Sequence, residues 1–101
     1  MKSFNNVELI KFPELDEIDD ALMGKAFQRF LDKVGLNDED RLVLTSKEYA
    51  KGGLRRQHEI KARLIFSKKD FTASETGWQL IETVQNVLKK LEKEVLKSTS
   101  K

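Results

Sequence analysis

The residues whose chemistry stands out in this sequence are cations. Between Lys47 and Lys69 the chain carries eight Lys and Arg residues and only two acidic ones, Glu48 and Glu59. Such side chains contact nucleic-acid phosphates, and binding of this kind weakens steeply as salt rises. The segment therefore indicates a phosphate-binding surface, to which a loop and the following strand contribute Arg55, Arg56, Lys61 and Arg63.

A second group of cations lies near the end of the chain. On a helical wheel these residues fall opposite an apolar stripe, and they are Lys89, Lys90, Lys93 and Lys97. Positive charge is also favourable in itself near a helix C-terminus, which offers a second explanation for them. We expect the loop, the strand face and this helix end to form one phosphate-tracking surface.

The net charge of +2 is unevenly divided along the chain. Residues 1–40 carry five Lys and Arg against ten Asp and Glu, a balance of −5, and residues 41–101 carry fourteen against seven, a balance of +7. Charge separated in this way is typical of a basic surface, provided that the residues converge in space. Solvated charge without a partner is the alternative.

Residues suited to catalysis are few. The chain has one histidine, His58, and no cysteine, so a disulfide framework, a thiolate metal site and a cysteine nucleophile are excluded. Gly52-Gly53 lacks the Gly-Lys-Ser/Thr ending of a phosphate loop, and the acidic run of residues 14–20 lacks the spacing of a calcium loop. We expect no enzyme, and neither a cofactor, a metal ion nor a small-molecule substrate.

The elements that must hold the cations follow from hydrophobic periodicity. The pattern predicts strands at Val7–Phe12, Arg41–Glu48, His58–Phe66 and Phe71–Ala73, and helices at Glu14–Val34 and from Thr76 onward. The order β-α-β-β-β-α favours an α+β two-layer sandwich, with two helices on one face of a four-stranded mixed sheet. Residues 1–97 would form one domain and residues 98–101 a frayed tail.

Local signals refine this prediction. The apolar face of the first helix is expected to contain Leu15, Ile18, Leu22, Ala26, Phe30 and Val34, with Gly35 as the C-terminal stop. A capping box of Thr76 and Gln79 would open the second helix, and Trp78 would anchor it to the sheet. The Leu42–Leu44 run indicates a strand buried on both faces, and residues 67–70 indicate a hairpin turn. No apolar run approaches the ~20 residues of a membrane span, so a cytosolic protein is expected.

Two segments resemble the ribosome hibernation-promoting factor and protein Y family. They are Leu42–Glu48 and Thr76–Lys97, and the family has the same β-α-β-β-β-α order. The last helix of that family has an aromatic residue one turn ahead of an Ile–acidic pair, and Trp78, Ile81 and Glu82 match this pattern. The family's last helix also ends in lysine-rich turns, which the four helix-end lysines match. Glu17–Leu22 is similar to the start of its first helix.

The resemblance implies a short-form stress or stationary-phase factor that occupies the small ribosomal subunit near the decoding centre and blocks messenger and transfer RNA. The partner would be small-subunit ribosomal RNA, and the protein would be a monomer away from the ribosome. Because the family uses basic residues of both helices, the resemblance adds Lys25, Arg29 and Lys33 to the expected RNA-binding residues. The sequence departs from the family in its acidic first helix and at Thr76-Gly77-Trp78, where an acidic residue and a tyrosine are common.

Two other functions stay open. Double-stranded RNA-binding domains share the last three strands and helix, but the usual Lys-Lys-x-Ala-like helix start is not found in residues 74–78. A protein–protein adaptor that uses an apolar sheet surface is the other, and its binding would respond little to salt.

Overall fold

The computed structural model describes residues 6–50, 53 and 56–99. Six elements follow one another: β1 (Val7–Ile10), α1 (Glu17–Val34), β2 (Arg41–Ala50), β3 (Arg56–Phe66), β4 (Lys69–Gly77) and α2 (Leu80–Thr99). The predicted α+β fold class and element order are confirmed.

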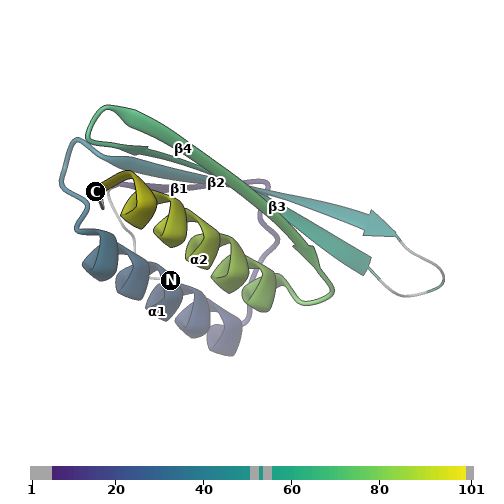
Figure 1. The fold of residues 1–101 in the computed structure, drawn as a ribbon. Coiled ribbons are helices and arrows are strands. Elements are labelled where there is room, and N and C mark those ends of the chain that lie inside the picture. The colour runs from purple at the N-terminus through teal and green to yellow at the C-terminus, as the bar shows by residue number, and fades with distance from the viewer. Residues whose placement is uncertain (1–5, 51–52, 54–55, 100–101) are drawn as a thin grey trace.

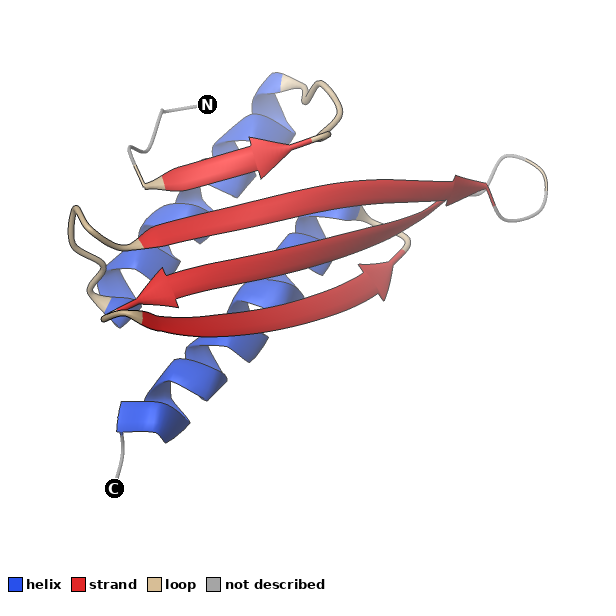
Figure 2. Cartoon of the chain, turned by 90° about the horizontal axis from the view of Figure 1, so that it is seen from above, coloured by secondary structure: helices blue, strands red, loops and turns tan. Residues whose placement is uncertain are grey.

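One mixed sheet forms the first layer, with the strands in the order β1-β2-β3-β4. β1 pairs with β2 in parallel, and the two later pairs are antiparallel. Both helices lie on the same face of this sheet, which leaves the other face open (Figures 1 and 2). The β2–β3 hairpin continues past its neighbours, because β1 pairs with β2 only as far as Thr45 and β4 pairs with β3 only as far as His58.

The ends of α1 are set by two residues. The Asp16 carboxylate accepts a hydrogen bond of 2.8 Å from the Asp19 N–H, so the helix begins at Glu17 and the predicted start at Glu14 is wrong. Gly35 ends the helix as predicted: it has a left-handed φ of 73°, and its N–H donates to the Leu31 carbonyl at 2.8 Å.

The core lies between the sheet and the inner faces of the helices. The predicted stripe of α2 is buried from Val84 onward, and Leu80 and Ile81 at its start are partly buried. The inner side chains of β2 and β3, among them Leu44 and Ile60, are buried as well. The predicted face of α1 is partly wrong: Met23, Phe27 and Phe30 are buried, whereas Ile18 is 73% and Leu22 40% exposed. Two apolar stripes of α1 share Phe30, and the side chains that fill the space against the sheet and α2 belong to the other stripe.

Three further predictions need correction. Val43 is only half buried, because none of the described elements covers the face of β2 opposite the helices. β4 is nine residues long and includes Thr76, so the predicted short strand and the capping box at Thr76 are wrong. Trp78 consequently lies in the connection to α2, 48% exposed, and is not part of the core in which it was expected to anchor the helix.

The predicted turns are found in part. Ser67 and Lys68 both have positive φ, 51° and 65°, and connect the Phe66–Lys69 pair of β3 and β4. This is the backbone of a hairpin with a two-residue loop. Lys69 and Asp70, which were predicted to lie in the turn, belong to β4 instead. Of the predicted Gly52-Gly53 turn, Gly52 lies outside the described residues. α2 continues to Thr99, two residues past the predicted domain end.

Candidate nucleic-acid interface

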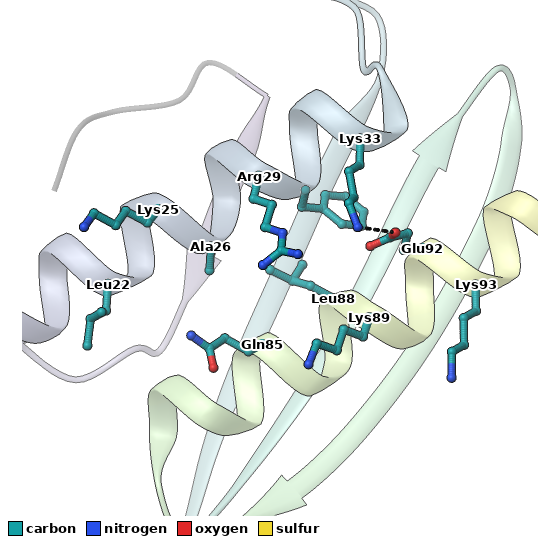
Figure 3. A pocket seen from close by; sticks show the side chains of 11 residues that line it. Leu22, Lys25, Ala26, Arg29, Lys33, Gln85, Leu88, Lys89, Glu92 and Lys93 are labelled. Atoms are coloured by element: carbon teal, nitrogen blue, oxygen red, sulfur yellow. Dashed lines mark ion pairs between the residues drawn. The ribbon is translucent and has the colours of Figure 1, made fainter.

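A groove runs between the two helices on the outer side of the molecule. Because each helix follows a strand and returns along the sheet, α1 and α2 run in the same direction (Figure 1). The groove has a volume of about 510 Å³, and its apolar floor includes Phe30 of α1 and Leu88 of α2, which are 3% and 4% exposed. Figure 3 shows the polar side chains that both helices place around this floor.

The rim of the groove is strongly cationic. Five Lys and Arg residues line it, against one carboxylate, Glu92, and they are Lys25, Arg29, Lys33, Lys89 and Lys93. Lys33 Nζ lies 3.3 Å from Glu92 Oε1 and so forms an ion pair across the groove. The other four cations form no ion pair within the described residues. Five positive charges and one negative charge leave the groove with +4.

Helical spacing produces this rim. Lys25, Arg29 and Lys33 are four residues apart in α1, so they project from one face at a rise of about 6 Å each. Lys89 and Lys93 repeat the same spacing on α2. Two parallel rows of cations over an apolar floor can contact successive phosphates of a nucleic-acid strand, without reading its sequence.

Lys90 is directed away from the groove. Its Nζ lies 2.9 Å from Glu75 Oε2 and donates to the Ser74 carbonyl at 3.0 Å, which ties α2 to β4. One residue of helix is a rotation of about 100°, so adjacent lysines face different neighbours. Lys97 is exposed in the last turn of α2 and does not line the groove.

The predicted strand cations lie on the opposite face of the sheet. Lys61 and Arg63 alternate with the buried residues of β3 and therefore point to the open face. Arg63 makes two hydrogen bonds from Nε to the Asp70 carboxylate, one of them 2.9 Å long. These bonds lower the pKa of Asp70 and raise that of Arg63.

Of the two remaining sequence-predicted cations, the structure describes one. Arg56 lies in β3 near its start, with Nη1 3.4 Å from Glu48 Oε2. Arg55 lies outside the described residues. The single surface expected from loop, strand and helix end is therefore not formed, because the sheet stands between Lys61 and Arg63 on one side and the helix groove on the other.

Sequence reasoning did not foresee the groove's polar and apolar partners. Glu92 and Gln85 line it beside the cations, and Leu22 and Ala26 add to its apolar wall. Glu92 is three residues after Lys89, so a wheel analysis of α2 could have placed it on the same side. The packing of α1 against α2, which brings Glu92 to Lys33, leaves no such signal in the sequence.

Other chemistry is sparsely represented. His58 lies in β3 with Nδ1 3.7 Å from Glu48 Oε1. The Tyr49 hydroxyl donates to Glu59 at 3.2 Å, and this hydrogen bond raises the pKa of Tyr49. Across residues 6–50, 53 and 56–99, no group of three His, Cys, Asp or Glu side chains could hold a metal ion. In the same residues neither helix is long and apolar enough to cross a membrane.

Comparisons with known proteins give similarity in structure alone. No family model matches the sequence, and no curated protein matches it. A ribosomal subunit interface protein from Coxiella burnetii has a TM-score of 0.64 at 14% identity, over 94% of this chain and 98% of that chain. The N-terminal domain of Protein Y from Thermus thermophilus has a TM-score of 0.59 at 12% identity, over 91% and 94%. This chain therefore shares the fold of the Protein Y N-terminal domain.

Proposed function

We propose that this protein is a hibernation-type factor that binds the small ribosomal subunit near the decoding centre and inhibits translation. The observation that carries the proposal is the +4 groove between the parallel helices. The shared fold supports it, since one protein with this fold is named for the ribosomal subunit interface. The resemblance of the last helix to the hibernation-promoting and protein Y family points to the same site.

The proposed mechanism is steric: the protein occupies its site on the subunit, and no covalent bond is made or broken. Lys25, Arg29 and Lys89 are exposed and have no ion pair in the described part of the chain. A ribosomal RNA phosphate that binds them therefore displaces water and does not have to break an ion pair. Each such contact releases counterions from the RNA, which makes the binding strongly salt-dependent. A domain held in this way would prevent messenger and transfer RNA from entering. We place this activity in the cytoplasm, with the protein arriving as a monomer.

Co-sedimentation with purified small subunits tests the proposal. The variant K89E/K93E reverses two groove cations, and we expect it to lose most of its binding at about 0.1 M salt, where screening is incomplete. The matched control K47E/K61E makes the same change in net charge in β2 and β3, away from the groove. We expect the control to bind like the wild type. Equal loss in both variants would show that net charge, and not the groove, determines binding.

A second pair of variants compares two adjacent lysines, one in the groove and one outside it. Lys90 adjoins Lys89 but is paired with Glu75, so K90Q should leave subunit binding unchanged while K89Q weakens it. Binding by wild-type protein that does not change with salt would contradict a phosphate-based mechanism and would favour the protein–protein adaptor. Preference for a plain RNA duplex over the subunit would favour the double-stranded RNA-binding module.

A further inference from the structure

Large apolar side chains are exposed at the end of the molecule where both helices begin. Ile18, in the first turn of α1, is 73% exposed, which is more than any other large apolar side chain in the described residues. Leu22 follows one turn later on the same side, 40% exposed. The starts of α1 and α2 lie at the same end of the molecule (Figure 1), and Trp78, which is 48% exposed, precedes α2 by two residues. We call Ile18 and Trp78 the helix-start surface, and Leu22 connects this surface with the groove that it lines.

Acidic residues predominate around Ile18 and Trp78. Residues 12–24, which are flanked by the cations Lys11 and Lys25, contain five Asp and Glu and no Lys or Arg, and residues 76–88 contain one Glu and no Lys or Arg. Glu14, Glu17 and Glu82 are exposed among these. Carboxylates stabilise a helix N-terminus, which explains residues such as Glu17 in the first turn. That effect does not explain an isoleucine left in water beside them.

This combination excludes RNA as the occupant and selects a basic protein. Phosphates would be repelled by the carboxylates, whereas an amphipathic segment rich in Lys and Arg would pair with them and cover the apolar side chains. We infer that the helix-start surface docks a cationic, amphipathic protein segment of the particle to which the groove binds. The inference rests on the proposed function and assigns it a second contact, made to ribosomal protein.

Two substitutions outside the groove test this inference. Glu17→Lys replaces an exposed carboxylate, so it weakens binding to intact small subunits if a basic protein lies there and strengthens it if RNA does. Ile18→Ser removes the most exposed apolar side chain, and we expect a loss of about tenfold in affinity for the subunit. The control Leu96→Ser removes an apolar side chain that is 54% exposed near the other end of α2. We expect it to bind like the wild type.

The same variants are then measured against protein-free small-subunit RNA. We expect Ile18→Ser to bind this RNA as tightly as the wild type, because the groove cations are intact. A photo-crosslinker at position 18 should join a Lys- and Arg-rich segment of a ribosomal protein. Crosslinks to RNA alone, crosslinks to a second copy of this chain, or tighter subunit binding by Glu17→Lys would each overturn the inference while leaving the groove proposal in place. Wild-type protein that fails to bind subunits would overturn the proposed function, and this inference with it.

Discussion

Asp40 is the residue that joins two connections distant in sequence. It is 5% exposed, and its carboxylate accepts hydrogen bonds from the Asn37 N–H at 3.0 Å and from the Ser67 N–H at 3.1 Å. The first bond closes the loop between α1 and β2. The second holds the β3–β4 turn, whose Ser67 has a φ of 51°. One buried side chain thus fixes where β2 begins relative to the last hairpin.

Removal of this carboxylate should cost substantial stability. Asp40→Ala leaves the N–H groups of Asn37 and Ser67 without their acceptor, and we expect the free energy of unfolding to fall by about 1–3 kcal/mol. Asp40→Asn keeps one carbonyl oxygen as an acceptor, so we expect about half that loss. Urea unfolding followed by circular dichroism measures both. A loss under about 0.5 kcal/mol in the alanine variant would show that water satisfies the two donors.

At the residue scale, the sequence predicts the type of a side chain better than its direction. The lysines of the last helix are recognisable as cations, yet the sequence does not separate Lys89 in the groove from Lys90 on β4. Lys90 is held on β4 by its ion pair with Glu75, and Glu75 lies outside the shorter strand that the sequence predicts. Asp40 gives no signal at all, because its partner Ser67 is 27 residues away.

The joint between β4 and α2 leaves no room for a side chain at Gly77. Gly77 ends β4 opposite His58, and a Cβ built on it would lie 2.5 Å from Thr83 Oγ1. Thr83 is 1% exposed, and its hydroxyl donates to the Gln79 carbonyl at 2.6 Å, so it has little freedom to move. Gly77 does not have a positive φ, and the requirement for glycine is therefore steric.

A double-mutant cycle isolates this steric contact. We expect Gly77→Ala to lower the free energy of unfolding by about 1–3 kcal/mol, the usual cost of overpacking. In a Thr83→Ala background the same substitution should cost much less, because the obstructing hydroxyl is gone. A Thr83→Ser background keeps the hydroxyl, so the full cost should return there. Equal costs in all three backgrounds would show that the contact with Thr83 does not determine the residue at position 77.

At the element scale, strong periodicity was sufficient and weak periodicity was not. Apolar residues recur at helical spacing in α2 and alternate with polar ones in β3, and both elements were predicted to within a few residues of their observed bounds. β4 reads as a strand only at Phe71–Ala73, because its other residues are polar. It is extended to nine residues by pairing with β3 along its length, and this pairing is a tertiary effect.

The whole molecule has its charge separated along the helix axes. The first turn of α1 has three carboxylates and that of α2 has one, Glu82, while the last turn of each helix has a lysine, which is the arrangement that each helix dipole favours. Because α1 and α2 are parallel, the two gradients add and do not cancel (Figure 2). The charge division along the chain, −5 before residue 41 and +7 after it, did not predict this arrangement, since the groove takes three of its cations from the acidic half.

Glu92 is the one carboxylate that opposes this separation inside the groove, and its removal tests the electrostatic account of the whole molecule. Glu92→Gln raises the groove from +4 to +5 and releases Lys33 for a phosphate. We expect affinity for a labelled single-stranded RNA to rise several-fold at about 0.1 M salt and the slope of log K against log salt to steepen by about 0.7. Glu94→Gln makes the same change in net charge at an exposed residue that does not line the groove, and it should leave the slope unchanged. Fluorescence anisotropy across a salt series measures both variants. Equal slopes for Glu92→Gln and the wild type would mean that Lys33 makes no phosphate contact and that the RNA lies elsewhere on the protein.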